Sequence, residues 1–244
     1  MKRIYNMLKG IYLAFIKNDK NYRYLIAEKI SNNIFPFFTH TENDKYFLED
    51  VDFVNDYKKF DNQNFRSMDR KYMLIQMLKL TKHLSGSVAE CGVFKWATSY
   101  FILKNIDSNK KLHLFDSFEW LSNPSGIDWN HWCEWSLYAS EDEVKNNLKD
   151  FNNIVFHKWR IPNKFHEVLN EEFSFVHIDV DLYEPTKDSI EFFYKKLQKW
   201  WMIICDDSWF KTCPWARKAI IEFSKINNIE FLDLPTWQWI MIKM

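Results

Sequence analysis

The spacing of apolar and polar positions changes repeatedly along this chain. From Ser87 onward, short apolar runs of strand length alternate with segments whose apolar residues recur every three to four positions. Five strand–helix alternations are followed by two further strand-like runs, which meet at Pro235 and Thr236 closely enough for an antiparallel hairpin. This order predicts an α/β fold with a doubly wound, mostly parallel sheet and an antiparallel strand near one edge.

The individual elements follow from these runs. Strands are expected over residues 88–91, 111–116, 153–157, 173–179, 200–207, 230–234 and 237–244, which gives a seven-stranded sheet. Helices are expected over residues 69–83, 97–105, 185–197 and 214–226, with two more starting at Ser140 and Pro162. Ser140 and Glu143 have the spacing of a capping box, and Pro185 and Pro214 suit a first helical turn.

Residues 1–66 follow a different pattern from residues 67–244. They are rich in aromatic, Asn and charged residues, and their helix-like segments over 5–17 and 21–34 are broken by Asn pairs and Pro36. We expect a helical N-terminal appendage that serves as a lid or a dimerisation segment, in a protein that forms a homodimer. Residues 1–30 hold seven Lys or Arg against Asp19 and Glu28. Such a basic segment either touches an anionic membrane surface or is simply solvated.

Composition narrows the class of protein. The 244 residues are 47% hydrophobic and 27% charged, as in a soluble globular protein, and the formal net charge of zero argues against binding to nucleic acid. The apolar run near the N-terminus, residues 11–16, is too short for a signal peptide or a transmembrane span. Four cysteines lie far apart without CxxC spacing, which predicts buried thiols in a cytoplasmic protein.

Carboxylates follow two of the expected strands. Asp179 and Asp181 are one residue apart, so strand alternation would point both side chains the same way. Asp206 and Asp207 end the strand over 200–207. The carboxyl ends of parallel strands form the ligand-binding edge of a sheet, and clustered carboxylates there favour a hard cation such as Mg²⁺. His177, inside the strand, is either a satisfied core residue or a group that orients a metal-bound carboxylate.

The first two strands have features of a site for an adenosine cofactor. Glu90 closes the first strand, Gly92 makes the turn, and Thr98 lies in the first turn of the next helix, whose N-terminus is suited to an anionic group. Asp116 ends the second strand and is placed to accept hydrogen bonds from both ribose hydroxyls. Trp159 follows the third strand, where an adenine ring would rest. With four glycines and no GxGxxG, the chain lacks the signature of an NAD enzyme.

The chain resembles the macrocin O-methyltransferase (TylF) family, from about Ser67 to the C-terminus. Four runs carry the resemblance: SVAECGVFKWATS, LHLFDSFEWL, FVHIDVDLYEPTKDSIEFFYKKL and MIICDDSWFKTCPWARKAIIEF. The family consists of metal-dependent sugar O-methyltransferases on the Rossmann-like class I S-adenosylmethionine fold. The resemblance therefore implies S-adenosylmethionine and Mg²⁺ as cofactors and a sugar hydroxyl as the methyl acceptor.

The resemblance also implies roles for particular residues. It makes Asp181 the general base, and it makes the Mg²⁺ ligands Asp179, Asp206 and Asp207. By the same resemblance, the cofactor pocket includes Glu90, Gly92, Thr98, Asp116 and Ser117. The family pattern commonly has Gly-Gly after the Lys of the first run, where this sequence has Trp96 and Ala97.

Two other functions fit parts of the sequence. Asp179-Val180-Asp181 has the form of the DxD motif of a metal-dependent glycosyltransferase, although that function leaves Asp206, Asp207 and the CPWARKA segment unexplained. A catalytically idle fold that acts as a partner or glycan-binding subunit would have no reason to keep four carboxylates. The segment over residues 120–135 is either an acceptor lid or a dimer contact. Its Trp and His side chains are Trp120, Trp129, His131, Trp132 and Trp135.

Overall fold

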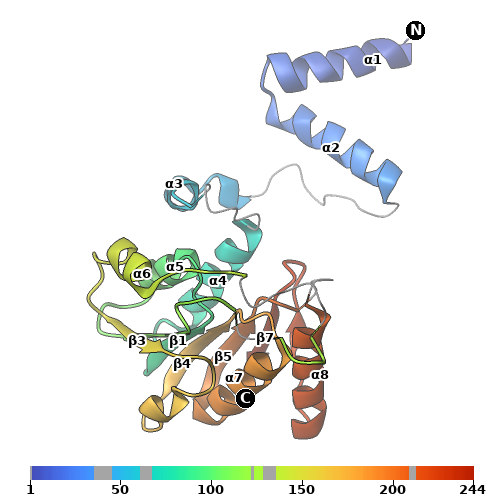
Figure 1. The fold of residues 1–244 in the computed structure, drawn as a ribbon. Helices are drawn as coiled ribbons and strands as arrows, with labels where there is room; N and C mark the ends of the chain where they lie inside the picture. Colours follow the sequence, from blue (N-terminus) through green and yellow to red (C-terminus); the bar gives the residue numbers. More distant parts are fainter. Residues whose placement is uncertain (1, 36–45, 61–67, 122–123, 129–135, 209–212) are drawn as a thin grey trace. The chain divides into compact units, whose positions relative to one another are not determined.

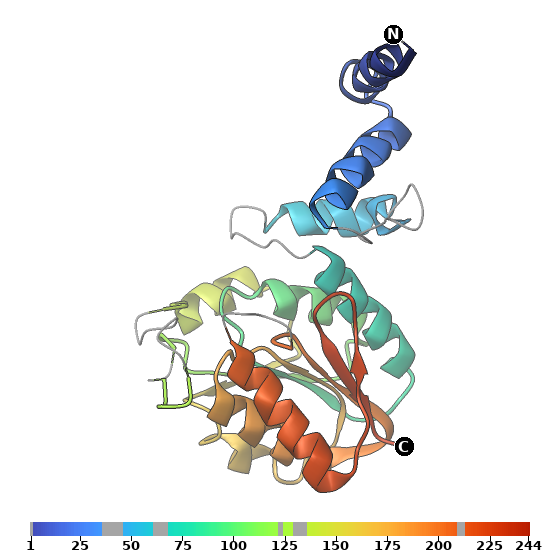
Figure 2. The same ribbon diagram turned by 90° about the vertical axis from the view of Figure 1, so that its right-hand side faces the viewer.

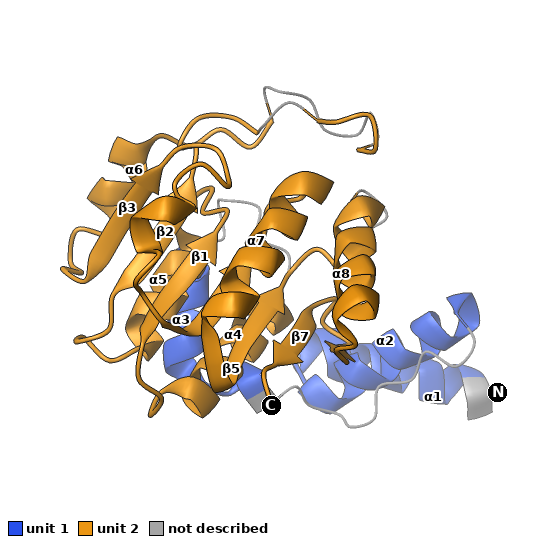
Figure 3. Ribbon diagram, turned by 90° about the horizontal axis from the view of Figure 1, so that it is seen from below, with its two compact units in different colours: residues 1–61 blue, residues 62–244 orange. Residues whose placement is uncertain are grey.

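The structure is a computed structural model that describes residues 2–35, 46–60, 68–121, 124–128, 136–208 and 213–244. The chain divides into two compact units, residues 1–61 and residues 62–244 (Figure 3). The sequence predicts this boundary between residues 66 and 67, five residues later than the division in the structure.

The first unit is helical. Its elements are α1 (Lys2–Ile11), a π-helical turn (Tyr12–Ile16), α2 (Lys20–Ile34), a 3-10 turn (Tyr46–Leu48) and α3 (Val51–Lys58). Asn18 adopts a left-handed backbone with φ of 57° and reverses the chain between α1 and α2. Asp19 then caps α2 by accepting a hydrogen bond from the backbone N–H of Tyr22 at 3.2 Å. The helices expected over 5–17 and 21–34 are therefore confirmed, whereas α3 was not anticipated.

The second unit is built on one seven-stranded sheet with the strand order β3-β2-β1-β4-β5-β7-β6 (Figure 1). Its strands are β1 (Ser87–Cys91), β2 (Leu112–Asp116), β3 (Ile154–Lys158), β4 (Phe173–Ile178), β5 (Leu197–Cys205), β6 (Leu232–Asp233) and β7 (Trp239–Ile242). The first five strands pair in parallel, and β7 runs antiparallel to both β5 and β6. The predicted sheet and its C-terminal hairpin are thereby confirmed.

The outer strand β6 is shorter than the expected strand over 230–234, because only two of its residues pair with β7. It is tied to α8 by a side-chain contact in which both terminal nitrogens of Arg217 donate to the Asp233 carboxylate, at 2.9 and 3.1 Å. This paired, planar geometry is the strong form of an arginine–carboxylate contact. The edge of the sheet is therefore both short and charged.

Helices cover both faces of the sheet (Figure 2). They are α4 (Met68–Thr81), α5 (Ala97–Asn105), α6 (Glu141–Asn147), a 3-10 turn (Phe165–Val168), α7 (Tyr183–Lys196) and α8 (Pro214–Asn227). Helices α4 and α5 pack together on one face, and α7 and α8 pack together on the other. Ser140 caps α6 by accepting the N–H of Glu143 at 3.2 Å, and Pro214 is the first residue of α8. The helix expected from Pro162 starts only at Phe165.

The two faces of the sheet differ in chemistry. Side chains of successive strand residues point to opposite faces, and every residue of the central strand β4 is buried. One face is the apolar core, which packs against α7 and α8 and includes Ala89, Cys91, Val176 and Ile178. The alternate residues Glu90 and His177 are fully buried on the other face, which α4 and α5 cover. That second face therefore buries charge, and this charge adjoins the functional site.

Three of the four cysteines lie in the described part of the chain. Cys91, Cys205 and Cys213 are buried and form no disulfide among the described residues, which confirms the prediction of buried thiols for these three. Cys133 lies outside the described residues. Among the helices that the structure describes, none combines the length and apolar character needed to cross a bilayer.

Two buried histidines face each other on neighbouring strands β2 and β3. Nδ1 of His113 lies 2.9 Å from Nε2 of His157, and Nδ1 of His157 lies 2.7 Å from the Glu167 carboxylate. Burial, followed by the charges of His157 and Lys111, lowers the pKa of His113 from 6.5 to about 4. His113 therefore stays neutral in the folded chain at pH values where the unfolded chain protonates it.

We expect His113 to make folding less favourable in acid. Its folded-state pKa lies below its unfolded-state pKa, so its stabilising contribution is complete above pH 6.5 and is lost as the pH falls toward 4. The loss at pH 4 is about 3 kcal/mol in the free energy of unfolding. Urea unfolding at a series of pH values between 4 and 7 measures this dependence.

The variant His113→Phe removes the titrating group, so its free energy of unfolding should depend less on pH across this range. His83 is exposed, and the variant His83→Phe should keep the pH dependence of the wild type. An unchanged pH dependence in His113→Phe would show that other groups account for the acid sensitivity.

Candidate functional site

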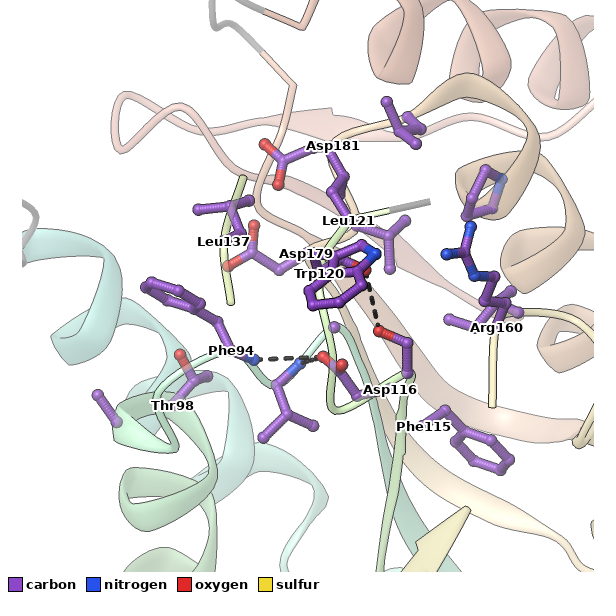
Figure 4. A pocket seen from close by; sticks show the side chains of 18 residues that line it. Phe94, Thr98, Phe115, Asp116, Trp120, Leu121, Leu137, Arg160, Asp179 and Asp181 are labelled. Carbon is purple, nitrogen blue, oxygen red and sulfur yellow. Dashed lines mark hydrogen bonds between the residues drawn. The ribbon is translucent and has the colours of Figure 1, made fainter. Parts of the chain in front are cut away.

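A pocket opens at the carboxyl edge of the sheet, where β1, β2 and β4 end (Figure 4). Ligands of open parallel sheets bind at this edge. The turn after β1, the N-terminus of α5, the end of β2 and the loop after β4 each contribute to its wall. The polar and aromatic residues of the wall are Phe94, Thr98, Phe115, Asp116, Ser117, Trp120, Arg160, Asp179 and Asp181.

Gly92 allows the backbone of two strand ends to approach each other. It has φ of 84°, and a Cβ at this position would lie 1.9 Å from the carbonyl oxygen of Asp179. Only glycine fits such an approach with a left-handed backbone. Gly92 therefore makes the turn after β1, as the sequence predicts, and it sets the distance between that turn and the acidic loop after β4.

Asp116 ties the turn after β1 to the loop after β2. One of its carboxylate oxygens accepts the backbone N–H groups of Val93 at 2.7 Å and Phe94 at 3.3 Å, and the other accepts that of Phe118 at 2.7 Å. Burial raises the pKa of Asp116, although these hydrogen bonds oppose the shift. The side chain lies in the wall of the pocket, as Figure 4 shows.

The acidic loop after β4 has a geometry that strand alternation does not describe. Strand β4 ends at Ile178, so Asp179 and Asp181 are loop residues. Strand alternation therefore does not apply to them, and the expectation that it points both side chains the same way assumed a wrong strand end. Asp181 has a left-handed backbone with φ of 60°. Its N–H donates to the Asp207 carboxylate at 2.9 Å, and its carbonyl accepts the indole N–H of Trp215. These contacts hold the loop so that both carboxylates line the pocket (Figure 4).

The four carboxylates form two neighbouring groups of potential metal ligands. In each group, the ligand atoms lie within 4.8 Å of one another. One group contains His177, Asp179 and Asp206, and the other contains Asp181, Asp207 and Cys213. The structure thus places the predicted ligand Asp207 beside the predicted base Asp181, whereas Asp179 and Asp206 share the other group.

The charges of the two groups are balanced differently. Burial and then the charge of Asp179 raise the pKa of Asp181 to about 7. Burial and the charges of Asp181 and Asp179 raise the pKa of Asp207 well above its usual value. Burial also disfavours the charged form of Asp206, but Arg70 and His177 outweigh it and lower the pKa of this carboxyl. Without a cation beside them, Asp181 and Asp207 therefore favour their protonated forms, whereas Asp206 stays ionised.

Asp206 is held by the partly buried cation Arg70, the amide of Gln238 and the buried ring of His177. Nη1 of Arg70 lies 3.1 Å from one carboxylate oxygen, and Nε2 of Gln238 donates to the other at 2.7 Å. His177 lies between two carboxylates, 3.3 Å from Asp206 and 3.4 Å from Glu90. Burial would lower the pKa of His177, but the charge of Asp206 and then Glu90 raise it to about 9. His177 is therefore a core residue with charged partners on both ring nitrogens.

Four of the six predicted cofactor residues line the pocket, namely Gly92, Thr98, Asp116 and Ser117. Glu90 is fully buried behind the pocket wall, where it accepts a hydrogen bond from the hydroxyl of Ser99. The Trp159 side chain is 58% exposed and is not part of the wall, whereas the next residue, Arg160, is. Arg160 was not predicted from the sequence, where its signal was a position two residues after the end of β3.

The Trp-rich connection after β2 is described only in part. Trp120 lies in the wall of the pocket, and residues 129–135, which include Trp129, His131, Trp132 and Trp135, lie outside the described residues. Asp128 is buried and anchors the described part of the connection, because it accepts the N–H of Tyr183 at 3.0 Å at the start of α7. An acidic side chain at a helix N-terminus is stabilising. This cap was not predicted from the sequence, because Asp128 is 55 residues away from Tyr183.

The family model described as macrocin-O-methyltransferase (TylF) matches residues 67–236. The chain belongs to the macrocin-O-methyltransferase (TylF) family. This membership confirms the predicted enzyme class, an S-adenosylmethionine-dependent O-methyltransferase, in preference to a glycosyltransferase. A search of curated proteins finds no match for this chain.

Solved structures with the same fold include several O-methyltransferases. The O-methyltransferase NovP is 18% identical, with a TM-score of 0.60 over 72% of this chain and 80% of NovP. The calicheamicin methyltransferase CalS11 is 14% identical, with a TM-score of 0.64 over 76% of this chain and 83% of CalS11. An O-methyltransferase from Bacillus cereus in complex with SAH is 12% identical, with a TM-score of 0.53 over 89% and 97%. At these identities the similarity shows the fold of this TylF-family chain.

We expect the variant Gly92→Ala to disrupt the pocket of this TylF-family protein. The new Cβ would clash with the Asp179 carbonyl and the left-handed backbone would be strained, so the free energy of unfolding should fall by about 2 kcal/mol or more. A Cβ on Gly126 would meet open space, with no atom within 4 Å beyond its chain neighbours, so the variant Gly126→Ala should retain wild-type stability. Urea unfolding compares the two, and equal midpoints would contradict the close approach.

We expect the variant His177→Leu to be strongly destabilised. It leaves Glu90 and Asp206 buried without the cation between them, and breaking a buried charge pair costs about 3–5 kcal/mol. The exposed His166 provides the matched control, since His166→Leu should change the free energy of unfolding by less than about 0.5 kcal/mol. Guanidinium unfolding measures both variants. A small effect of His177→Leu would mean that the ring is not charged in the folded protein.

Proposed function

We propose that this protein transfers the methyl group of S-adenosylmethionine to a sugar hydroxyl in a Mg²⁺-dependent reaction. The acceptor sugar is free, nucleotide-linked, or part of a surface glycan or natural product. One observation carries the proposal: the features suited to an adenosine cofactor and the acidic loop line the same pocket, with Thr98 and Asp116 alongside Asp179 and Asp181. Methyl donor and acceptor would therefore meet in one cavity.

The proposed cofactor site follows from the ends of β1 and β2. The turn at Gly92 and the first turn of α5 with Thr98 are suited to the anionic end of the cofactor, because helix N-termini attract negative charge. The Asp116 carboxylate already accepts three backbone N–H groups, which leaves about one of its four lone-pair sites for a ligand. It would then bind one ribose hydroxyl, and not both as expected from the sequence.

The remaining predicted cofactor residues act at the margins of this site. We assign Trp159, beside the pocket residue Arg160, as the contact for the adenine ring, with its exposed indole face available for stacking. Glu90 acts indirectly, because its contacts are Ser99 and His177 inside the protein. Ser117 lines the pocket and donates to the carbonyl of Trp120 at 3.2 Å, which shapes the loop beside the ribose site.

The acidic residues fit Mg²⁺ by the chemistry of their oxygen atoms. Oδ2 of Asp206 is buried and lies 3.1 Å from Nη1 of Arg70, and Asp207 has the like charges of Asp181 and Asp179 beside it. Carboxylate oxygens are the ligands that Mg²⁺ prefers, and a divalent cation would relieve the repulsion among them. Asp179, Asp206 and Asp207 would hold the cation. When bound, it would supply Lewis acidity that lowers the pKa of the acceptor hydroxyl.

Asp181 is the proposed general base. Its half-buried carboxylate lines the pocket next to Asp179, and its backbone is fixed by the hydrogen bond to Asp207. In the proposed reaction, the sugar oxygen attacks the methyl carbon while Asp181 takes the hydroxyl proton. The carbon–sulfur bond breaks, and the products are the methyl ether, S-adenosylhomocysteine and a protonated Asp181. Alignment of the two substrates in one pocket supplies much of the acceleration in such a reaction.

We expect the variant Asp179→Asn to lose about 100-fold or more in kcat/KM for methyl transfer, because it removes a charged ligand of the proposed cation. Its affinity for S-adenosylhomocysteine, measured by calorimetry, should stay within about threefold of the wild type. Asp107 is a half-buried acid far from the pocket lining that pairs with Lys82, and the variant Asp107→Asn should retain both activity and affinity.

Two measurements test the sugar acceptor and the metal assignment. Incubation with S-adenosylmethionine and candidate sugars should give a product heavier by one methylene, detected by mass spectrometry. Full activity of Asp179→Asn would rule out the metal assignment. Absence of a methylated sugar product, with S-adenosylhomocysteine still bound, would contradict the proposed acceptor class.

A further inference from the structure

The N-terminal helical hairpin carries an exposed apolar stripe. Ile4, Leu8, Ile11 and Phe15 recur at helical spacing along α1 and its π-helical continuation, so they lie on one side of the helix. All four are exposed, with Ile4 and Phe15 each at 61%. Single exposed apolar residues are common on proteins, but a continuous stripe along a helix marks an interaction surface.

The stripe is not used in the packing of the hairpin itself. A Cβ on Gly10 would lie 3.8 Å from the ring of Tyr22 in α2, so a small residue of α1 faces α2. Ala14 is fully buried, and its carbonyl oxygen accepts a hydrogen bond from Nε of Arg23 at 2.8 Å. The hairpin is therefore closed by small residues and a backbone contact, and the large aliphatic side chains of α1 remain outside this contact.

The charge of the hairpin identifies the kind of surface that fits it. Residues 1–35 contain seven Lys or Arg and only two acidic residues, Asp19 and Glu28. Lys9, Lys17 and Lys20 are exposed. A basic amphipathic helix is complementary to a surface that is negatively charged outside and apolar beneath, which is the arrangement of an anionic lipid bilayer.

We propose that the hairpin of residues 2–35 docks the enzyme on an anionic lipid bilayer, with the stripe of Ile4, Leu8, Ile11 and Phe15 inserted below the headgroups. The stripe spans about 16 Å at the helical rise of 1.5 Å per residue, about half the thickness of the hydrocarbon core. The helix therefore lies in the plane of the interface. Tyr5 and Tyr12, which are also exposed, suit the polar boundary of the bilayer.

Flotation of the full-length protein with vesicles tests this docking. One set of vesicles contains phosphatidylcholine alone, and the other contains phosphatidylcholine and phosphatidylglycerol in equal amounts. We expect the protein to float with the anionic vesicles, with much weaker binding to the neutral ones and a loss of binding at high salt. Absence of flotation, or equal binding to both sets, would overturn the proposal.

Variants separate the stripe from the rest of the surface. The double variant Ile11→Asp/Phe15→Asp should bind anionic vesicles about tenfold or more weakly, because it removes two apolar side chains that would insert into the bilayer. Ile226 in α8 is 82% exposed, and Ile226→Asp should bind as the wild type does. The double variant Lys17→Glu/Lys20→Glu should also weaken binding, although an acid at the first position of α2 favours that helix.

Two further measurements make the result decisive. Circular dichroism and S-adenosylhomocysteine affinity should be unchanged in all three variants, so a loss of flotation is neither misfolding nor failure of the proposed catalytic function. Sedimentation velocity without lipid tests whether a second copy of the chain, and not a bilayer, covers the stripe. If Ile11→Asp/Phe15→Asp dissociates a dimer and leaves vesicle binding intact, the stripe is an interface between two copies of the chain and the proposal is wrong.

Discussion

Charge buried on one face of the sheet must be balanced within the protein, and this requirement organises the site. Glu90 on β1, His177 on β4 and Asp206 after β5 lie side by side, and Arg70 adds a cation from α4. Ionised groups without partners are costly to bury, so each member fixes the position of the next. The apolar face toward α7 and α8 has no such requirement. The charged face thereby adjoins the acidic edge of the pocket.

The strand and helix order was predictable from the sequence because it depends on local patterns. Buried parallel strands give short apolar runs, and amphipathic helices give a period near 3.6, so the seven strands and their hairpin follow without knowledge of distant contacts. The positions of Asp116 and of the acidic pairs at strand ends follow from the same logic. The TylF resemblance added the enzyme class, which spacing alone does not contain.

The contacts that set the chemistry of the site were not predictable in this way. Arg70 and Asp206 are 136 residues apart in sequence, and nothing around Arg70 distinguishes it from a surface charge. The direction of Asp181 depends on a left-handed backbone at a residue with a side chain. Phe94 and Trp96 adopt such backbones too, with φ of 46° and 61°, and Trp96 stands where the family commonly has glycine. Such conformations persist only when tertiary packing imposes them.

The two-residue strand β6 has a consequence for how copies of this protein can associate. An open sheet edge is a template for further strands, and long flat edges lead to fibrillar aggregation. Here the outer edge offers only Leu232 and Asp233, and the Asp233 carboxylate is fixed by Arg217. A charged, truncated edge of this kind acts as a gatekeeper against strand addition. Sheet extension across β6 is therefore disfavoured as a route of self-assembly.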